Sequence, residues 1–452
     1  MKIIIAGDGK VGATLTKQLS LEGYDITLID SNQKVLDSTL ERYDIMTLKG
    51  NCANMEVLEQ AGIKNADLLV AATSTDEINL LCCATAHKIN GKIHTIARIR
   101  NPEYRQQIYD MRDVFALSMI INPELQAARE IERLLSIPGF LKRETFAKGR
   151  VEIVELKVHK DSKLNGVTLN NLNSIVKCKV LVCTVVRNGQ SIIPGGDFVL
   201  KENDKIFVTA PAENLTILLK NLGIITKKVK RVIIAGGGKI SYYLAKGLEN
   251  TDISVTLIEQ DKNRCLELAA MLPKTDIING DASDHELLEA EGIGDCEALV
   301  TLTGIDELNI IISLFGNSHG VPQIITKLGR VEESSIIDSL PIGSTISPKR
   351  LCCNHIERYV RAMKNQTGAA IAVHLIADGN TEAMEFRVDS TTRNKDVPLK
   401  KLKLKKHVLL TSISKSGKIE IPDGDSFYSE GDSVIVVSGS DVAIRQINDI
   451  FE

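Results

Sequence analysis

An internal repeat is the feature that most constrains this chain. The run Ile3–Val11 (IIIAGDGKV) returns in the second half as Val232–Ile240 (VIIAGGGKI). Near the ends of the two halves, Ile193–Asp197 (IPGGD) returns as Ile421–Asp425 (IPDGD). Between these blocks, four polar residues of the first half have counterparts in the second: Thr73, Asp76, Glu77 and Asn79 match Thr303, Asp306, Glu307 and Asn309. A repeat of this extent means that one structural unit occurs twice. We therefore predict two tandem copies, roughly residues 1–226 and 227–452.

The first part of each copy has the pattern of a parallel α/β domain. Lys2–Ala6 is a continuous apolar run, which is typical of a strand buried on both faces of a sheet. Val11–Leu21 follows it with helical spacing. The alternation continues with expected strands at Asp25–Ile29, Ile45–Leu48, Leu68–Ala72 and Ile93–Arg98, and expected helices at Gln33–Arg42, Asn54–Ala61 and Glu77–Asn90. Such alternation implies βαβ crossovers, so each copy is predicted to hold a Rossmann-like parallel sheet covered on both faces.

The second part of each copy is rich in strands. In the first copy Val151–Val158 alternates, and Val180–Val186 is a strand that runs into the hairpin signal Asn188-Gly189. Asp204–Ala210 is expected to be a further strand and Pro211–Asn221 a short helix. This pattern predicts a small α+β module after each Rossmann-like domain. An amphipathic helix at Pro123–Ser136, stopped by Pro138-Gly139, joins the two parts, and the basic run Lys227–Arg231 is expected to be a solvated hinge between the copies.

A glycine fingerprint follows the first strand. Gly7, Gly9 and Gly12 form GxGxxG between a strand and a helix, with Asp8, Lys10 and Val11 between them. The first glycine permits a tight turn, the second lets a pyrophosphate approach the backbone, and the third lets the helix pack on the strand. Asp30 ends the next strand, where a carboxylate accepts hydrogen bonds from a ribose and repels a 2′-phosphate. The first copy is therefore predicted to bind a dinucleotide or adenine nucleotide, with NAD(H) preferred over NADP(H).

Further candidates lie at the carboxyl edge of the predicted sheet. Thr73 and Ser74 follow the fourth strand, and Arg98 ends the fifth, where it could pair either with a phosphate or with a neighbouring acid. In the second copy the fingerprint is Gly236-Gly237-Gly238-Lys239-Ile240-Ser241, with serine in place of the third glycine. Glu259 stands for Asp30, and Leu328 is matched to Arg98, with Lys327 and Arg330 nearby. The alternative for this copy is a degenerate Rossmann domain kept for packing.

Other classes of protein fit the sequence poorly. The net charge of -3, the absence of Trp and the 4% aromatic content disfavour a nucleic-acid-binding protein. The nine Cys include no CxxC pair, so we expect buried free thiols and no metal site. No apolar run approaches the length of a membrane span, and the N-terminus lacks the pattern of a signal peptide. No catalytic motif is found, and no histidine repeats between the copies, so we do not expect an enzyme.

These residues together resemble the RCK (regulator of potassium conductance) domains. The fingerprint Gly7–Gly12, Asp30, Thr73 and the stretch Ala97–Tyr104 (ARIRNPEY) are similar to the RCK N-terminal domain, and Pro194–Asp197 with Glu202–Asp204 looks like the RCK C-terminal domain. The tandem order is similar to the TrkA family, the peripheral NAD-binding subunits of bacterial Trk potassium uptake systems. The domain prediction is as follows: RCK N-terminal 1–122 and 227–346, crossover helices 123–140 and 347–366, and RCK C-terminal 141–226 and 367–452.

The resemblance implies a function and a set of site residues. It places nucleotide contacts at Gly7, Asp8, Gly9, Lys10, Val11, Asp30, Thr73, Ser74 and Arg98, and in the second copy at Gly236, Gly237, Gly238, Lys239, Ile240, Glu259 and Thr303. It further implies a homodimer or homotetramer ring on the cytoplasmic face of the membrane, in which NAD(H), or else ATP or ADP, changes the ring's shape and gates a separate TrkH-type potassium-translocating subunit. Pro123–Ser136 and Pro348–Met363 would be crossover helices for dimer contacts, with packing inside one domain as the alternative.

Three other interpretations stay open at this point. The chain could be an NAD-dependent oxidoreductase, or an RCK regulator of a different cation transporter or channel. The C-terminal modules could also bind another small ligand, such as a cyclic dinucleotide. Asp30 contacts only a ribose in this scheme, so the residues do not rank NAD⁺, NADH, ATP and ADP against one another.

Overall fold

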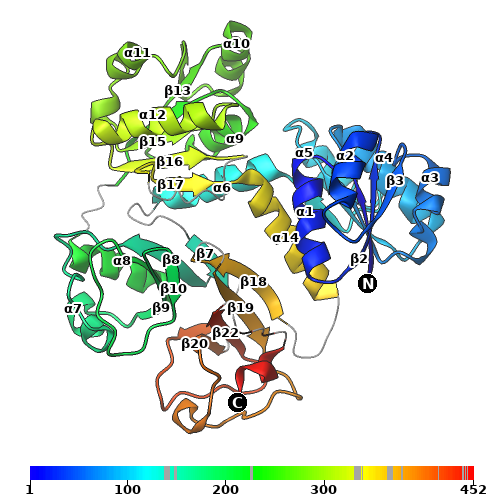
Figure 1. Cartoon of the computed structure of the whole chain (residues 1–452). Coiled ribbons are helices and arrows are strands. Elements are labelled where there is room, and N and C mark those ends of the chain that lie inside the picture. Colours follow the sequence, from blue (N-terminus) through cyan, green and yellow to red (C-terminus); the bar gives the residue numbers. More distant parts are fainter. Residues whose placement is uncertain are drawn as a thin grey trace. The chain divides into compact units, whose positions relative to one another are not determined.

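The computed structural model (Figure 1) describes most of the chain. The described residues are 1–136, 143–146, 150–223, 228–329, 337, 340–363, 370–377, 380–415, 417–439, 442, 444 and 446–452. They form two compact units. The first comprises Met1–Arg129 and Ser347–Glu357, and the second Glu130–Ile346 and Arg358–Glu452. Pro138-Gly139, Lys227 and Arg330 lie outside the described residues.

The first unit contains a six-stranded parallel sheet in the order β3-β2-β1-β4-β5-β6. Its strands are β1 (Lys2–Ala6), β2 (Asp25–Asp30), β3 (Met46–Lys49), β4 (Leu68–Ala71), β5 (His94–Arg98) and β6 (Met119–Ile121). The helices between them are α1 (Lys10–Leu21), α2 (Gln33–Leu40), α3 (Met55–Gln60), α4 (Asp76–Ile89) and α5 (Tyr104–Asp110). The strand order reverses between β1 and β4, which is where ligands bind in open α/β sheets.

The apolar sequence of the first strands explains why they take the middle of this sheet. Ile3, Ile4 and Ile5 of β1 are all buried, because helices cover both faces. Leu69 and Ala71 of β4 join Ile4 in one core with residues of α4. The edge strand β3 is only partly buried. Short β6 and α5 went unrecognised in the sequence, because runs of three to seven residues give little periodic signal.

The second unit contains a matching sheet in the order β14-β13-β12-β15-β16-β17, again with parallel neighbours. Its strands are β12 (Arg231–Ala235), β13 (Ser254–Glu259), β14 (Thr275–Asn279), β15 (Ala298–Thr301), β16 (Gln323–Lys327) and β17 (Ser344–Ile346). Its helices are α9 (Lys239–Leu248), α10 (Lys262–Met271), α11 (His285–Ala290) and α12 (Asp306–Ser318). The prediction of two Rossmann-like parallel-sheet domains is therefore confirmed.

Two five-stranded antiparallel sheets complete the second unit. One has the order β10-β9-β11-β8-β7, with β7 (Arg143–Phe146), β8 (Val151–Lys157), β9 (Leu181–Arg187), β10 (Gln190–Ile192), β11 (Lys205–Pro211), and helices α7 (Leu172–Val176) and α8 (Ala212–Leu222). The other has the order β18-β19-β22-β20-β21, with β18 (Ala370–Ile376), β19 (Thr381–Arg387), β20 (Val408–Lys415), β21 (Lys418–Glu420) and β22 (Ser433–Gly439).

The antiparallel sheets bear out the hairpin signal and share a core. Asn188 and Gly189 both have positive φ and join β9 to β10 as predicted. Phe146 and Phe207 of the first sheet lie in one buried cluster with Ile435 and Val437 of the second. The inner faces of the two modules therefore pack on each other.

Helices α6 (Pro123–Ser136) and α14 (Pro348–Met363) each contribute to both units. The α14 thiol of Cys353 lies 3.6 Å from the carbonyl oxygen of Val11, at the start of α1. In the second unit, Gln323 Nε2 of β16 donates to the carbonyl of Leu134 in α6 at 2.8 Å. Each helix thus contacts the Rossmann-like module of the other copy. Within the described residues, the helices are all too short or too polar to span a membrane.

Candidate functional site: two crevices at the carboxyl edges of the parallel sheets

The glycines of the fingerprint have two different structural roles. Gly7 has φ +99°, and a Cβ on it would lie 2.9 Å from the main chain of Thr73. A Cβ on Gly12 would lie 1.8 Å from the Gly7 carbonyl oxygen. Both positions therefore need glycine for the protein's own packing, as in the tight turn and the close helix–strand contact of a Rossmann fold.

Gly9 has no such packing reason. A Cβ on Gly9 would meet no heavy atom within 4 Å, and the same holds for Gly238 in the second copy. Each is the N-cap of its helix, α1 or α9, and neither helix has a side-chain cap. Space is thus open in front of two helix N-termini, whose N–H groups and dipoles favour an anion. This is the arrangement that a nucleotide pyrophosphate needs.

A carboxylate closes each crevice on the side of the second strand. The Asp30 carboxylate accepts from Asp8 N at 2.7 Å and from Asn32 N at 2.8 Å. Glu259 accepts from Gly237 N at 2.6 Å and from Asp261 N at 2.8 Å. The longer acid thus reaches the same place as the aspartate. Each carboxylate oxygen has a second acceptor site, so it can also accept from a ribose hydroxyl.

The loop after the fourth strand is held by an asparagine in both copies. Asn79 Oδ1 accepts from the Thr73 N–H at 2.8 Å and hydroxyl at 2.7 Å, while its Nδ2 donates to the Arg98 carbonyl at 2.8 Å. Asn309 repeats these contacts on Thr303 and Lys327. This residue was not among the predicted site residues, although its occurrence in both copies was a signal. It fixes the threonine at the crevice edge, whereas Ser74 is exposed.

Arg98 ends β5 and forms no ion pair with an acid among the described residues, so its contact with a phosphate stays a prediction. It is only 9% exposed, and its guanidinium donates to the Thr73 carbonyl. Burial lowers its pKa, and the nearby Arg100 adds to this effect. In the second copy Lys327 donates its ammonium to the Thr303 carbonyl in the same way. The matching of Leu328 to Arg98 was therefore wrong by one residue, and a cation stands at this position in both copies.

Asp8 differs most from its counterpart. Its side chain is buried and accepts from the Thr39 hydroxyl of α2 at 2.5 Å. Burial raises its pKa, and the nearby Asp30 raises it further. The Asp8 carboxyl thus faces α2, and only the main-chain N–H of Asp8 bonds to the Asp30 carboxylate. In the second copy Gly237 takes this position, and Arg264 of α10 donates to its carbonyl at 2.9 Å.

The remaining predicted residues line the start of each helix. Lys10 is exposed and Lys239 is half-buried, whereas Val11 and Ile240 are buried beneath the loop. Ser241, which replaces the third glycine, donates its hydroxyl to the Gly236 carbonyl. The Gly236 carbonyl corresponds to the Gly7 carbonyl, which lies against Gly12 in the first copy. In the second copy the serine hydroxyl forms a hydrogen bond with it. In each copy the predicted residues thus lie on the glycine loop, at the start of the following helix, and at the carboxyl ends of the second, fourth and fifth strands.

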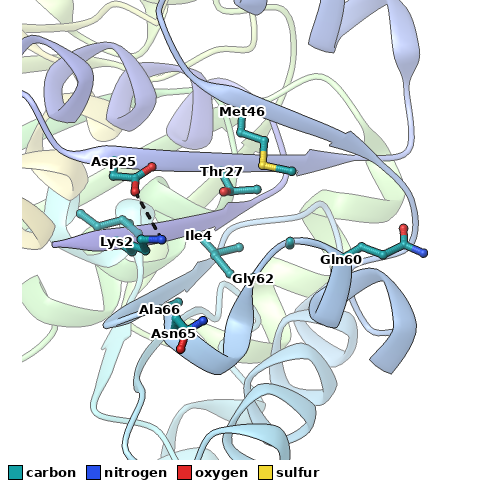
Figure 2. Close-up of a pocket in the computed structure, with 11 residues that line it drawn as sticks. Lys2, Ile4, Asp25, Thr27, Met46, Gln60, Gly62, Asn65 and Ala66 are labelled. Atoms are coloured by element: carbon teal, nitrogen blue, oxygen red, sulfur yellow. Dashed lines mark ion pairs between the residues drawn. The ribbon is translucent and has the colours of Figure 1, made fainter.

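A separate pocket of about 160 Å³ lies at the opposite edge of the first sheet. Figure 2 shows its lining at the amino ends of β1, β2 and β3, with Lys2 and Asp25 3.9 Å apart as an ion pair. Met46 and Gly62 also line it. In the second copy Arg231 lies over Gly292, the counterpart of Gly62. None of the predicted nucleotide residues lines this pocket.

All nine cysteines are free thiols, and each except Cys178 is buried. Among the described residues, no group of three or more His, Cys, Asp and Glu side chains is placed to hold a metal ion.

Comparison with known proteins decides the family. The TrkA-N domain model matches residues 3–123 and 232–348, and the TrkA-C domain model matches residues 153–223. The Trk system potassium uptake protein TrkA homolog of Archaeoglobus fulgidus is 33% identical, with 100% of both chains covered. The chain belongs to the TrkA family. The resemblance seen in the sequence is thereby confirmed.

Further TrkA relatives agree in length. The Trk system potassium uptake protein TrkA of Haemophilus influenzae is 31% identical over 100% of this chain and 99% of its own. Among solved structures, the GsuK RCK domain has a TM-score of 0.60 at 16% identity, covering 97% of this chain and 92% of its own. The GsuK channel bound to NAD has a TM-score of 0.61 at 16% identity, covering 97% and 77%. These two structures support the RCK fold of this TrkA family member.

Proposed function

We propose that the chain is the nucleotide-binding regulatory subunit of a Trk-type potassium uptake system and not an enzyme. The curated relatives are named as Trk system potassium uptake proteins. In this proposal the chain lies in the cytoplasm, peripheral to the inner face of the membrane. It assembles as a homodimer or homotetramer ring and gates a separate TrkH-type subunit.

The open space at Gly9 and Gly238 is the observation that supports nucleotide binding best. Packing alone explains Gly7 and Gly12 but gives no steric reason for the second glycine of each fingerprint. A pyrophosphate against the bare N-termini of α1 and α9 supplies that reason. Asp30 and Glu259 then accept from a ribose, and Arg98 and Lys327 place positive charge at the crevice edge.

NAD(H) is the expected ligand, with ATP and ADP as alternatives. The carboxylates of Asp30 and Glu259 lie where a 2′-phosphate would meet like charge, which disfavours NADP(H). One solved neighbour is described as bound to NAD and another as bound to ADP. Both ligands carry an adenosine and a pyrophosphate, the groups that this proposal assigns to the two sites.

Regulation requires that the ligand prefers one conformation of the protein. The first crevice has direct contacts for this purpose. Val11, at the start of α1, touches Cys353 of α14, and Arg100, two residues beyond Arg98, pairs with Glu124 of α6 at 3.0 Å. A nucleotide that moves α1 or the β5 end therefore acts on both helices that the two units share.

Isothermal titration calorimetry with NAD⁺, NADH, ATP and ADP tests the nucleotide site. Asp30→Ala is expected to weaken binding by about tenfold or more, because a hydrogen bond to a charged group contributes about 1.5–3 kcal/mol. Asp44→Ala is the matched control, since Asp44 is an exposed acid away from the glycine loop. Equal affinity of the Asp30→Ala and wild-type proteins would reject the ribose contact.

The transport role has its own test. Deleting the gene is expected to abolish or misregulate potassium uptake. A strain whose uptake is unchanged across a range of external potassium concentrations would contradict the assignment.

A further inference from the structure

One segment of the second C-terminal module is far more basic than its counterpart in the first. Between β19 and β20, residues Leu399–His407 (LKKLKLKKH) hold five lysines and no acid. In the first module the corresponding segment begins LNNLN at Leu169. We refer to Lys401, Lys403, Lys405 and Lys406 as the lysine ridge.

Main-chain hydrogen bonds fix the correspondence of the two segments. Leu169–Asn171 and Leu399–Lys401 each form a 3-10 turn. Asn170 N donates to Gly196 O, and Lys400 N donates to Gly424 O, both at 2.8 Å. Asn170 and Asn171 of the first module therefore take the places of Lys400 and Lys401. The fold itself does not require lysine at these positions.

Main-chain hydrogen bonds hold the backbone of the ridge in place. Lys405 N donates to Ile450 O at 2.9 Å, and Glu452 N donates to Lys403 O at 3.0 Å. Leu402 and Leu404 pack against the module's hydrophobic core. Since side chains of an extended segment alternate in direction, Lys403 and Lys405 project from the opposite side.

The charge of the ridge is not neutralised within the described chain. Lys400 pairs with Asp425, but the four ridge lysines form no ion pair with any described residue. Lys401, Lys403 and Lys406 are exposed. The whole chain has a net charge of -3, so this positive surface is local and not part of a general cationic field.

We propose that the lysine ridge docks on the anionic surface of a lipid bilayer. A cluster of four or more lysines on a fixed surface is the pattern that anionic headgroups attract. Lysine also binds DNA phosphates, but duplex DNA is a poorer fit because the net charge of -3 gives the chain no broad cationic field. The choice of a membrane also rests on the proposed function, which puts the chain beside a membrane subunit.

Vesicle binding by the full chain tests this proposal without nucleotide or transporter. Phosphatidylglycerol vesicles are expected to bind the chain at low salt and release it at high salt, whereas phosphatidylcholine vesicles bind little. Lys401→Asn with Lys403→Asn is expected to weaken binding by roughly 25-fold, about fivefold for each lysine. Lys160→Asn with Lys201→Asn makes the same charge change on exposed lysines of the first module and should have little effect.

The outcomes separate this proposal from the nucleotide site. Failure to bind phosphatidylglycerol, or equal loss in both double variants, would overturn the ridge as a membrane surface. Tighter binding of duplex DNA than of vesicles, lost with the ridge lysines, would overturn it in favour of a nucleic acid. NAD(H) titration of the ridge variant should match wild type, and it reports on the proposed function separately.

Discussion

Substituting single glycines of the fingerprint distinguishes a glycine that leaves room for a ligand from a glycine that the protein's own packing requires. Gly9 has φ -77° and ψ -170°, an extended conformation that any residue adopts, and a new Cβ there meets no protein atom. Gly9→Ala should therefore leave the fold intact. Alanine is a poorer N-cap than glycine by roughly 0.5–1 kcal/mol, and the reduced freedom of the unfolded chain offsets this by about 0.4–1 kcal/mol.

In the proposed site, the same methyl group lies where the pyrophosphate approaches α1. Displacing the phosphate weakens one or two charge-assisted hydrogen bonds from the start of α1, each contributing about 1.5–3 kcal/mol. We therefore expect NAD(H) affinity of the first crevice to fall by at least about tenfold. Titration calorimetry should detect the loss of one of two sites, and Gly238→Ala should remove the other.

Gly12→Ala is the matched contrast. Its Cβ would lie 1.8 Å from the Gly7 carbonyl oxygen, so α1 must shift away from the strand. Overpacking of this kind costs about 3 kcal/mol or more, which lowers the melting temperature of a domain this size by roughly 6–12 °C. Gly9→Ala should melt within about 2 °C of wild type. Wild-type NAD(H) affinity in Gly9→Ala would refute the placement of the phosphate.

Three further outcomes are expected. Burial raises the pKa of Asp8, so the native state holds this proton more tightly than the unfolded chain does. The native state therefore loses stability as pH rises above 3.8 toward the raised value. Asp8→Asn, which keeps an acceptor for Thr39, should flatten this part of the pH–stability curve, and an unchanged curve would contradict the burial. In native protein near pH 8, a thiol reagent should label Cys178 first, because each of the other cysteines is buried. Cys83 should react slowly, since burial raises its pKa to about 12. Fast labelling of Cys83 would show that the core around α4 opens. Asn79→Leu removes the contacts that hold Thr73, so it should weaken nucleotide binding at the first crevice, whereas the equivalent Asn309→Leu should leave that crevice unchanged. Calorimetry of both variants in parallel checks this. Equal loss of affinity at the first crevice in the two variants would argue against a local effect.

The sequence predicted well what depends on local rules. The first and third glycines and the apolar run of β1 have one structural meaning each, so the turn, the strand and the position of Asp30 could be predicted without coordinates. The repeat then carried the same interpretation to Glu259, whose carboxylate reaches its own loop as Asp30 does. The nucleotide contacts and the domain boundaries stay predictions.

Contacts between residues far apart in the chain could not be predicted in this way. The hydroxyl of Thr39 meets Asp8 across 31 positions, and no periodicity marks the pair. The counterpart of Arg98 was misplaced because the single inserted residue does not extend to β16, where Lys327 and not Leu328 holds the loop carbonyl. The exchange of α6 and α14 between the copies is likewise a matter of packing that an amphipathic pattern leaves open.

The exchange of helices gives the repeat a functional meaning that two separate domains would lack. If α14 packed on its own copy, occupancy of the first crevice would act only on the first copy. Instead Cys353, from the second copy, touches the Val11 carbonyl at the start of the first nucleotide helix. In the proposed function, a ligand held at that helix start acts on a helix whose later residues belong to the second unit. If the proposed nucleotide shifts α14, reciprocal coupling requires that a partner that shifts α14 also changes the affinity of the first crevice for that nucleotide.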